Sequence, residues 1–221
     1  MTMPSPKRGS ATGGASDPGA PAPEPSVTGA TSLTPEASLA ALMAGNARYA
    51  GARLRVCARN LPAALRETEY HQAPIASVLA CADSRVPVEL VFDQGVGRVF
   101  VARVAGNIAT PEIIASLEYG VAVLGTPVIM VLGHRNCGAV AATMARMPAP
   151  GRISSLYAFI RPAVECAGAD ADKAIRINAT MQAEVLARTS PVLSGAIAER
   201  RLRIVPAYYD VGSGKVTLLD P

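Results

Sequence analysis

The stretches IASVLACADSR at residues 75–85 and PVIMVLGHRNCG at residues 127–138 decide the fold. Each begins with a short continuous apolar run, 75–80 and 127–132, which is typical of a strand buried on both faces of a sheet. Side chains that carry reactive groups follow directly after each run. Because ligands gather beyond the carboxyl ends of the strands in open α/β sheets, we expect these side chains to meet there.

Outward from these two stretches, apolar runs alternate with helical patterns. Further strands are expected at 99–104, 202–209 and 215–219, the last two forming a closing pair around a glycine-rich turn. Helices are expected at 36–49, at 110–125, at 136–147, and as two or three segments within 153–199. This alternation predicts an α/β fold: a mainly parallel central β-sheet flanked by helices, with a C-terminal strand pair.

The length of 221 residues suits one main domain. Residues 1–31 are almost wholly Pro, Ala, Gly, Ser and Thr, so we expect a disordered tail there and one folded domain over residues 32–221. No apolar run reaches the ~20 residues of a membrane span, so no membrane partner is expected. The basic pair Lys7-Arg8 is followed by small polar residues instead of the apolar stretch of a secretory signal, which favours a cytoplasmic protein.

The charge pattern argues against a nucleic-acid partner. The net charge of +4 is spread over many positions, the longest basic cluster is Arg200-Arg201-x-Arg203, and tryptophan is absent. Four cysteines in a chain of this length do not make a disulfide scaffold. The segment from Asn178 to Thr180 fits a glycosylation sequon, for which a cytoplasmic chain has no use.

The side chains after the two decisive strands suit a metal ion. Cys81 and Asp83 follow the first strand, and His134 and Cys137 follow the second. Zinc takes cysteine and histidine ligands in tetrahedral geometry, and three protein ligands with one open position are typical of a catalytic site. Cys137 also begins a helix, so we expect the helix dipole to lower its thiol pKa. A single cysteine in either position would most simply be a buried apolar thiol. The occurrence of both cysteines together with His134 and Asp83 at two strand ends favours a metal site instead.

The two segments resemble the β-class carbonic anhydrases. The signatures of that family are Cys-x-Asp-Ser-Arg and, further along, His-x-x-Cys-Gly; this chain has CADSR at 81–85 and HRNCG at 134–138. The blocks FDQGVGRVFVARVAGN at 92–107 and SLEYGVAVLGTPVIMVLGH at 116–134 also look like the family's intervening segments. Weaker similarity extends the resemblance to roughly residues 34–219.

The resemblance implies that Zn²⁺ is bound by Cys81, His134 and Cys137. It implies that Asp83 and Arg85 form the catalytic dyad of the family. In some members the equivalent aspartate is itself the fourth zinc ligand at rest, and in others the arginine holds it away. Asp83 is therefore a candidate both for catalysis and for metal binding, and an unrelated structural ion pair between Asp83 and Arg85 is the plain alternative.

The resemblance also implies a substrate pocket made by Gln72, Phe100, Tyr119 and the glycine of the second motif, Gly138. In the family two subunits build each pocket, so self-association as a dimer or tetramer is expected, with Gln72 and Tyr119 supplied by the neighbouring chain. The alternatives are ordinary core packing for Phe100 and Tyr119, and a loop-capping role for Gln72. The remaining histidine, His71, is either a surface residue or a proton shuttle.

The function implied by the resemblance is zinc-dependent, reversible hydration of carbon dioxide to bicarbonate and a proton, by attack of zinc-bound hydroxide. Three other functions stay open on the sequence. One is hydrolysis of carbon disulfide or carbonyl sulfide on the same scaffold. The second is a non-catalytic protein that binds zinc or bicarbonate. The third is a redox thiol protein, which would require two cysteines close enough to bridge without a metal.

Overall fold

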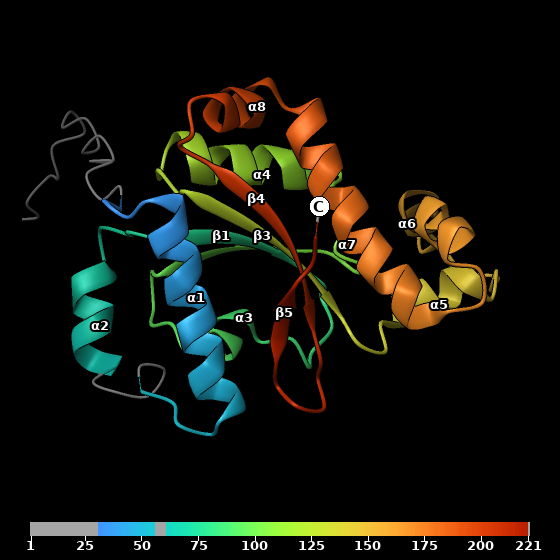
Figure 1. Cartoon of the computed structure of the whole chain (residues 1–221), viewed down its shortest axis with the longest axis horizontal. Helices are drawn as coiled ribbons and strands as arrows, with labels where there is room; N and C mark the ends of the chain where they lie inside the picture. Colours follow the sequence, from blue (N-terminus) through green and yellow to red (C-terminus); the bar gives the residue numbers. More distant parts are fainter. Residues whose placement is uncertain (1–30, 56–60, 221) are drawn as a thin grey trace, which may run out of the picture.

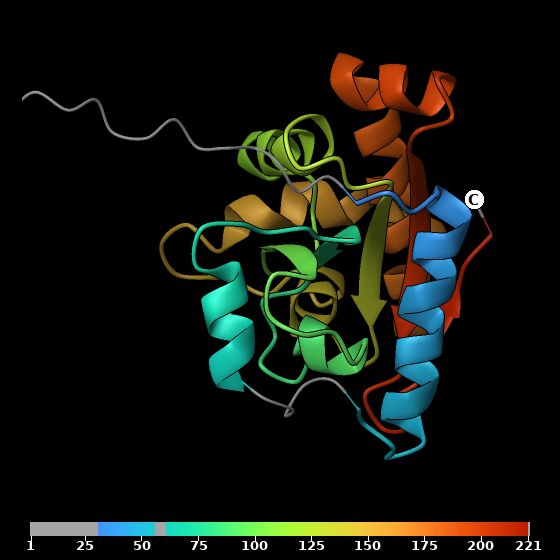
Figure 2. The same cartoon turned by 90° about the vertical axis from the view of Figure 1, so that its left-hand side faces the viewer.

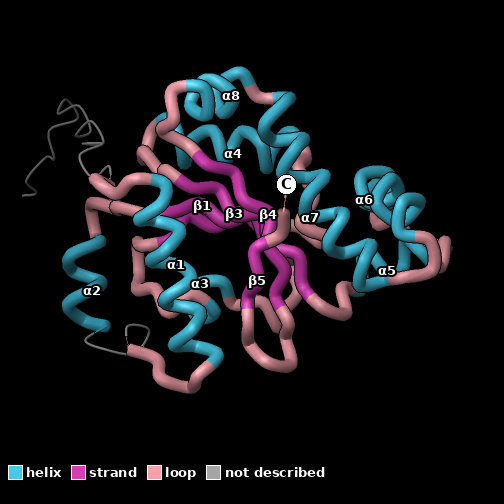
Figure 3. The backbone as a smooth tube through the Cα atoms, in the orientation of Figure 1, coloured by secondary structure: helices cyan, strands magenta, loops and turns pink. Residues whose placement is uncertain are grey.

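A five-stranded sheet forms the centre of the computed structural model, which describes residues 31–55 and 61–220. The strand order is β2-β1-β3-β4-β5, and the first four strands run parallel while β5 is antiparallel to β4. Figures 1 and 3 label β1, β3, β4 and β5 at the centre of the molecule. The predicted fold class is therefore confirmed. The tail expected over residues 1–31 lies, apart from Thr31, outside the described residues. The strands are β1 (Ala76–Ala80), β2 (Val99–Arg103), β3 (Val128–His134), β4 (Arg203–Tyr209) and β5 (Val216–Leu218).

Helices flank the sheet, and most of them were expected. The helices are α1 (Pro35–Ala50), α2 (Leu61–Thr68), α3 (Val88–Val91), α4 (Pro111–Ala122), α5 (Gly138–Met144), α6 (Ser154–Ala167), α7 (Ala171–Thr189) and α8 (Pro191–Ala198). The sequence analysis missed α2 and α3. Helix α3 is a single turn, too short to show a periodic pattern, and α2 has no residue buried within this chain.

The sheet carries one apolar layer on each face, because successive strand side chains point to opposite sides. On one face Val78 and Met130 pack against α1 and the segment that contains α3. On the other face Leu79 and Val131 pack against α4, α7 and α8. Figures 1 and 2 show α1 on the face of the sheet opposite to the one covered by α7. Every residue of β1 and β3 is buried, as the continuous apolar runs predicted.

Helix α1 begins as the sequence indicated. The hydroxyl of Thr34 accepts a hydrogen bond from the Ala37 amide at 3.2 Å, and Pro35 opens the first turn. Further along, Gly45 lets α1 approach α3 closely. A Cβ atom at Gly45 would lie 1.8 Å from the carbonyl oxygen of Phe92.

We expect Gly45→Ala to destabilise the fold by about 1–3 kcal/mol or more, because the new methyl group collides with rigid backbone. The measurement is urea unfolding followed by circular dichroism. Gly195→Ala in α8 is the matched control, since a Cβ at that position meets no described atom within 4 Å. The control should raise the stability by about 0.5–1 kcal/mol, as alanine usually does in a helix. Equal effects of the two substitutions would contradict this packing argument.

The strand order indicates where along the sheet a ligand site is expected. The chain leaves β1 toward β2 on one side and leaves β3 toward β4 on the other, so the carboxyl ends of β1 and β3 form a switch point. Strand β3 extends two residues further than predicted and ends at His134, which pairs in register with Tyr209 of β4. Among the residues that the structure describes, no helix is long and apolar enough to cross a membrane.

Candidate metal centre

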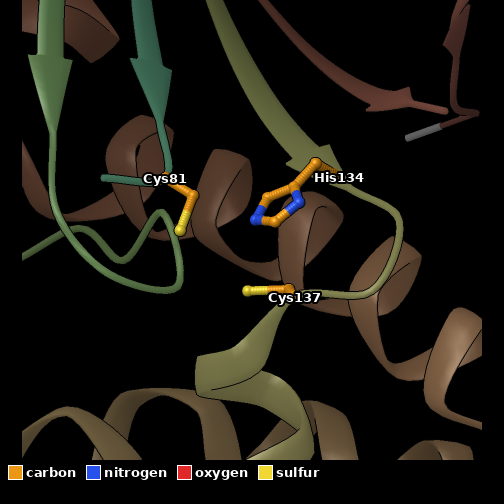
Figure 4. A group of neighbouring side chains, drawn as sticks. All are labelled: Cys81, His134 and Cys137. Atoms are coloured by element: carbon orange, nitrogen blue, oxygen red, sulfur yellow. The ribbon is translucent and has the colours of Figure 1, made fainter. Parts of the chain in front are cut away.

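Three metal-ligating side chains meet at this switch point. Cys81 follows β1 directly, His134 is the last residue of β3, and Cys137 immediately precedes α5. All three are buried, and their ligand atoms lie within 4.8 Å of one another. Figure 4 shows both sulfur atoms and the imidazole ring turned toward one common space. Two sulfurs and one imidazole nitrogen are the donor set that zinc prefers.

The imidazole of His134 is oriented by the backbone. Its Nδ1 lies 3.0 Å from the carbonyl oxygen of Arg135, so Nδ1 carries the proton and donates it to that oxygen. The opposite nitrogen, Nε2, then has a free lone pair that faces the two sulfurs. Nε2 is buried and has no hydrogen-bond partner within residues 31–55 and 61–220. A buried polar atom without a partner is costly, and a bound cation would supply the partner.

The two thiols influence each other strongly. The Cys137 thiol lies within hydrogen-bonding reach of Cys81 and lowers the pKa of Cys81 to about 4. In return, the Cys81 thiolate raises the pKa of Cys137 above its usual range. The α5 amides lower the pKa of Cys137, as its position at the helix start predicted, but the neighbouring sulfur and the burial of the thiol outweigh them, so the net shift is upward. A divalent cation between the sulfurs would favour the thiolate form of both.

Asp83 and Arg85 form a bidentate ion pair beside Cys81, His134 and Cys137. Arg85 Nε and Nη2 donate to Asp83 Oδ1 and Oδ2 at 2.9 and 2.8 Å, and Nη2 also donates to the Asn136 carbonyl at 3.1 Å. This guanidinium holds the pKa of Asp83 well below its usual range. Asp83 Oδ2 lies 4.0 Å from His134 Nε2. The carboxylate is thus near the three gathered ligands without being one of them.

The four expected pocket residues fall into two places. Gly138 lies next to Cys137, is exposed, and a Cβ there would meet no described atom within 4 Å. Phe100 and Tyr119 form a ring pair with centroids 6.1 Å apart. Phe100 pairs in register with Ser77 of β1, which lies four residues before Cys81. The rise of a strand puts Ser77 and Cys81 about 13 Å apart along β1. Gln72 lies beside Gly97, two residues before β2, since a Cβ atom at Gly97 would be 4.0 Å from the Gln72 side chain. This is the amino end of β2, whereas the metal centre lies at the carboxyl ends of the strands.

One residue near the metal centre escaped the sequence analysis. Arg103, at the end of β2, donates from Nε to the Cys81 carbonyl at 3.0 Å and from Nη2 to the Asp83 carbonyl at 2.6 Å. It thereby holds the segment that carries both residues. The neighbouring sequence contains no signal for this role, because the contact depends on the parallel register that pairs Ala80 with Arg103.

Comparison with known proteins agrees with this geometry. A family model described as carbonic anhydrase matches residues 76–216, which include every proposed zinc ligand. The carbonic anhydrase of Mycolicibacterium smegmatis is 34% identical over 197 residues, covering 83% of this chain and 93% of that protein. A structure from a study of two tetrameric β-carbonic anhydrases of Sordaria macrospora matches with a TM-score of 0.67 and 26% identity, over 83% of this chain and 98% of that one. The chain belongs to the β-carbonic anhydrase family.

A further β-carbonic anhydrase, from Coccomyxa, was solved in complex with acetazolamide. It matches this chain with a TM-score of 0.66 and 28% identity, over 82% of this chain and 86% of that one. The resemblance predicted from CADSR and HRNCG is confirmed, and with it the expectation that the chain is an enzyme. The match spans most of the length of the M. smegmatis, S. macrospora and Coccomyxa proteins, at 93%, 98% and 86% of each chain.

Proposed function

We propose that the chain catalyses the reversible hydration of carbon dioxide to bicarbonate and a proton, with Zn²⁺ held by Cys81, His134 and Cys137. The observation that carries this proposal is the buried, unpartnered Nε2 of His134 facing two cysteine sulfurs. When bound, zinc supplies a Lewis acid that lowers the pKa of water to about 7, which generates the nucleophile near neutral pH. Three protein ligands leave a fourth tetrahedral position for chemistry.

Asp83 is the proposed catalytic residue, and Arg85 positions it. Because its pKa is held low, the Asp83 carboxylate stays ionised and can only accept hydrogen bonds. By accepting the hydrogen of the attacking O–H group, it would direct an oxygen lone pair toward carbon dioxide. Arg85 fixes both carboxylate oxygens, which disfavours their rotation toward the zinc ligands. We therefore propose the form in which Asp83 is not a zinc ligand.

The test is stopped-flow carbon dioxide hydration by purified protein of known zinc content, between about pH 6.5 and 9. We expect about one zinc per chain and an activity that rises with pH, with a midpoint at or above about pH 7–8. A flat profile would contradict a titrating nucleophile. One zinc per chain without hydration at any pH would reject the function. Assays of the same preparation with carbon disulfide and carbonyl sulfide would then test the hydrolase alternative.

We further propose that the chain acts as a dimer or tetramer whose neighbouring subunits complete each pocket. Phe100 lies level with Ser77, four residues before Cys81 on the neighbouring strand, and its ring pairs with that of Tyr119, so we expect both side chains to serve a neighbouring metal centre instead of their own. Tyr119 is 47% exposed, and β2 forms an edge of the described sheet. A second copy docked on this edge would bring these two side chains and Gln72 to the neighbour's metal centre.

Mixing two inactive variants tests this arrangement. Cys137→Ser disables the metal centre, and the double variant Gln72→Ala/Tyr119→Ala disables the donated part of the pocket. After subunit exchange, half of the dimers are mixed, and each mixed dimer holds one site with every native residue. We expect about one quarter of the wild-type hydration activity to return. The control mixture, Cys137→Ser with His134→Ala, should stay inactive, and a fully active monomer by light scattering would contradict the proposal.

A further inference from the structure

We infer that Asn178 and Gln182 of α7 are positioning residues for the metal centre, and that they act through the loop that follows β2. The inference rests on one part of the proposed function, the binding of zinc by Cys81, and does not require that the chain hydrates carbon dioxide. Both amides are buried, with 0% and 4% of their surface exposed. Neither touches a candidate ligand directly, and both lie about 100 residues beyond Cys81 in the chain.

The loop after β2 delivers a backbone donor to the metal centre. The Asn107 amide donates to the Val104 carbonyl at 3.0 Å, closing a turn whose third residue, Gly106, has φ +81°. The Gly106 amide donates to Cys81 Sγ at 3.3 Å. The positive φ of this residue favours glycine, and a Cβ atom at Gly106 would also lie 2.6 Å from Cδ1 of Ile160, which would have to move. Glycine is the most flexible residue, and contacts from elsewhere must therefore hold it in place.

Helix α7 provides those contacts as a chain of two amides. Asn178 Nδ2 donates to the Gly106 carbonyl at 2.9 Å. Gln182 Nε2 donates to Asn178 Oδ1 at 3.3 Å and to the Phe159 carbonyl at 3.2 Å, and Gln182 Oε1 accepts from the Ala109 amide at 2.8 Å. One helix thus binds the loop at Gly106 and again at Ala109. We call Asn178 and Gln182 the amide relay.

The relay matters to the metal because of where the Gly106 amide points. A hydrogen bond to a thiolate draws charge from the sulfur and fixes its direction, as outer partners of metal ligands generally do. Without Asn178, the buried Gly106 carbonyl loses its partner, and the glycine is free to turn toward another one. The amide would then leave Cys81. Apolar residues could fill the same space on α7, so packing alone does not require two amides here.

Two α7 variants test the inference: Asn178→Leu, which removes the contact to Gly106, and Gln182→Met, which keeps volume but frees Asn178. Zinc affinity is measured by competition with a chromogenic chelator. Asn178→Leu should weaken it about 10–100-fold, and Gln182→Met should have a smaller effect in the same direction. In cobalt-loaded protein, the sulfur-to-cobalt absorption band should move in both variants, because the charge on the Cys81 sulfur changes.

Asn46→Leu is the matched control. Asn46 is also buried and also ties loops together, with Nδ2 donating to the Val91 and Gly214 carbonyls and Oδ1 accepting from the Val216 amide. It lies in the other apolar layer, so its loss should cost stability without changing zinc affinity or the cobalt band. The relay is rejected if both α7 variants fold and keep wild-type affinity and spectrum, or if the control changes them equally.

A measurement on the unaltered protein keeps the inference testable even if the variants fail to fold. Hydrogen exchange followed by NMR should show a strongly protected Gly106 amide, and rapid exchange of this amide would overturn the inference. None of these readouts depends on carbon dioxide. A wild-type protein that binds zinc without hydrating carbon dioxide would therefore reject the proposed function and leave the relay standing. Conversely, α7 variants with altered hydration activity but unaltered metal binding would reject the relay and leave the proposed function standing.

Discussion

His134→Ala will leave the chain without zinc and lower its carbon dioxide hydration by several orders of magnitude, to the uncatalysed rate. The imidazole provides the one nitrogen donor of the group, and its Nε2 has no other partner among the described residues. The two thiols that remain hold a proton between them, since the pKa of Cys137 is raised by Cys81. Two sulfurs alone do not make the three-ligand site that lowers the pKa of water.

The measurement is zinc per chain after dialysis against a weak chelator, together with stopped-flow hydration. His71→Ala is the matched control for zinc content: it removes the other histidine of the chain, which is exposed in the segment before β1. This control should keep one zinc per chain. If His134→Ala retained stoichiometric zinc, the metal centre assigned to the switch point would be wrong.

Arg85→Met will lower the maximal hydration rate by about 10²–10³-fold while zinc remains bound. The guanidinium holds both oxygens of Asp83 and also binds the Asn136 carbonyl. Without it, the pKa of Asp83 rises toward its ordinary value, and the carboxylate is free to turn toward His134, from which Oδ2 is only 4.0 Å away. A carboxylate that becomes the fourth ligand would block the position that the reaction needs.

The readouts are zinc content, the maximal rate and its pH profile. Arg201→Met is the matched control, because Arg201 forms an exposed ion pair of the same two-residue spacing with Glu199 at 2.6 Å, beyond α8. The control should behave like wild type. Arg85→Lys should rescue little, since an ammonium group cannot hold both oxygens of a carboxylate in a fork. Wild-type rates in Arg85→Met would make the pair a structural ion pair only.

Much of the fold could be predicted because burial leaves a direct trace in the sequence. Strands β1 and β3 are buried on both faces, so each is a continuous apolar run. The starts of α1 and α4 have proline in the first turn after a threonine, and both helices begin there. Helix α2 was missed since no residue in it is buried within the chain, and its apolar residues Leu61 and Leu65 stay half exposed.

The metal ligands could also be predicted, since each lies at a strand end or helix start that local patterns reveal. Cys81 and Cys137 are close in space because β1 and β3 are neighbours in a parallel sheet. Asn178 shows the opposite case. In the sequence it looks like part of a glycosylation sequon, whereas in the structure it is fully buried and binds Gly106. Nothing in the residues around it indicates this, because the contact joins positions 72 residues apart.

The sequence by itself determined the α/β class and the zinc-type donor set, because these follow from local hydrophobicity, spacing and chemistry, and the family resemblance of CADSR implied the pairing of Asp83 with Arg85. Only the tertiary structure decided which imidazole nitrogen faces the sulfurs, how Arg103 and the amide relay support the site, and that Phe100 lies level with Ser77, four residues before Cys81. The reason is physical: these features depend on strand register and on which backbone groups meet across the fold. Both are properties of the packed chain that no short segment contains.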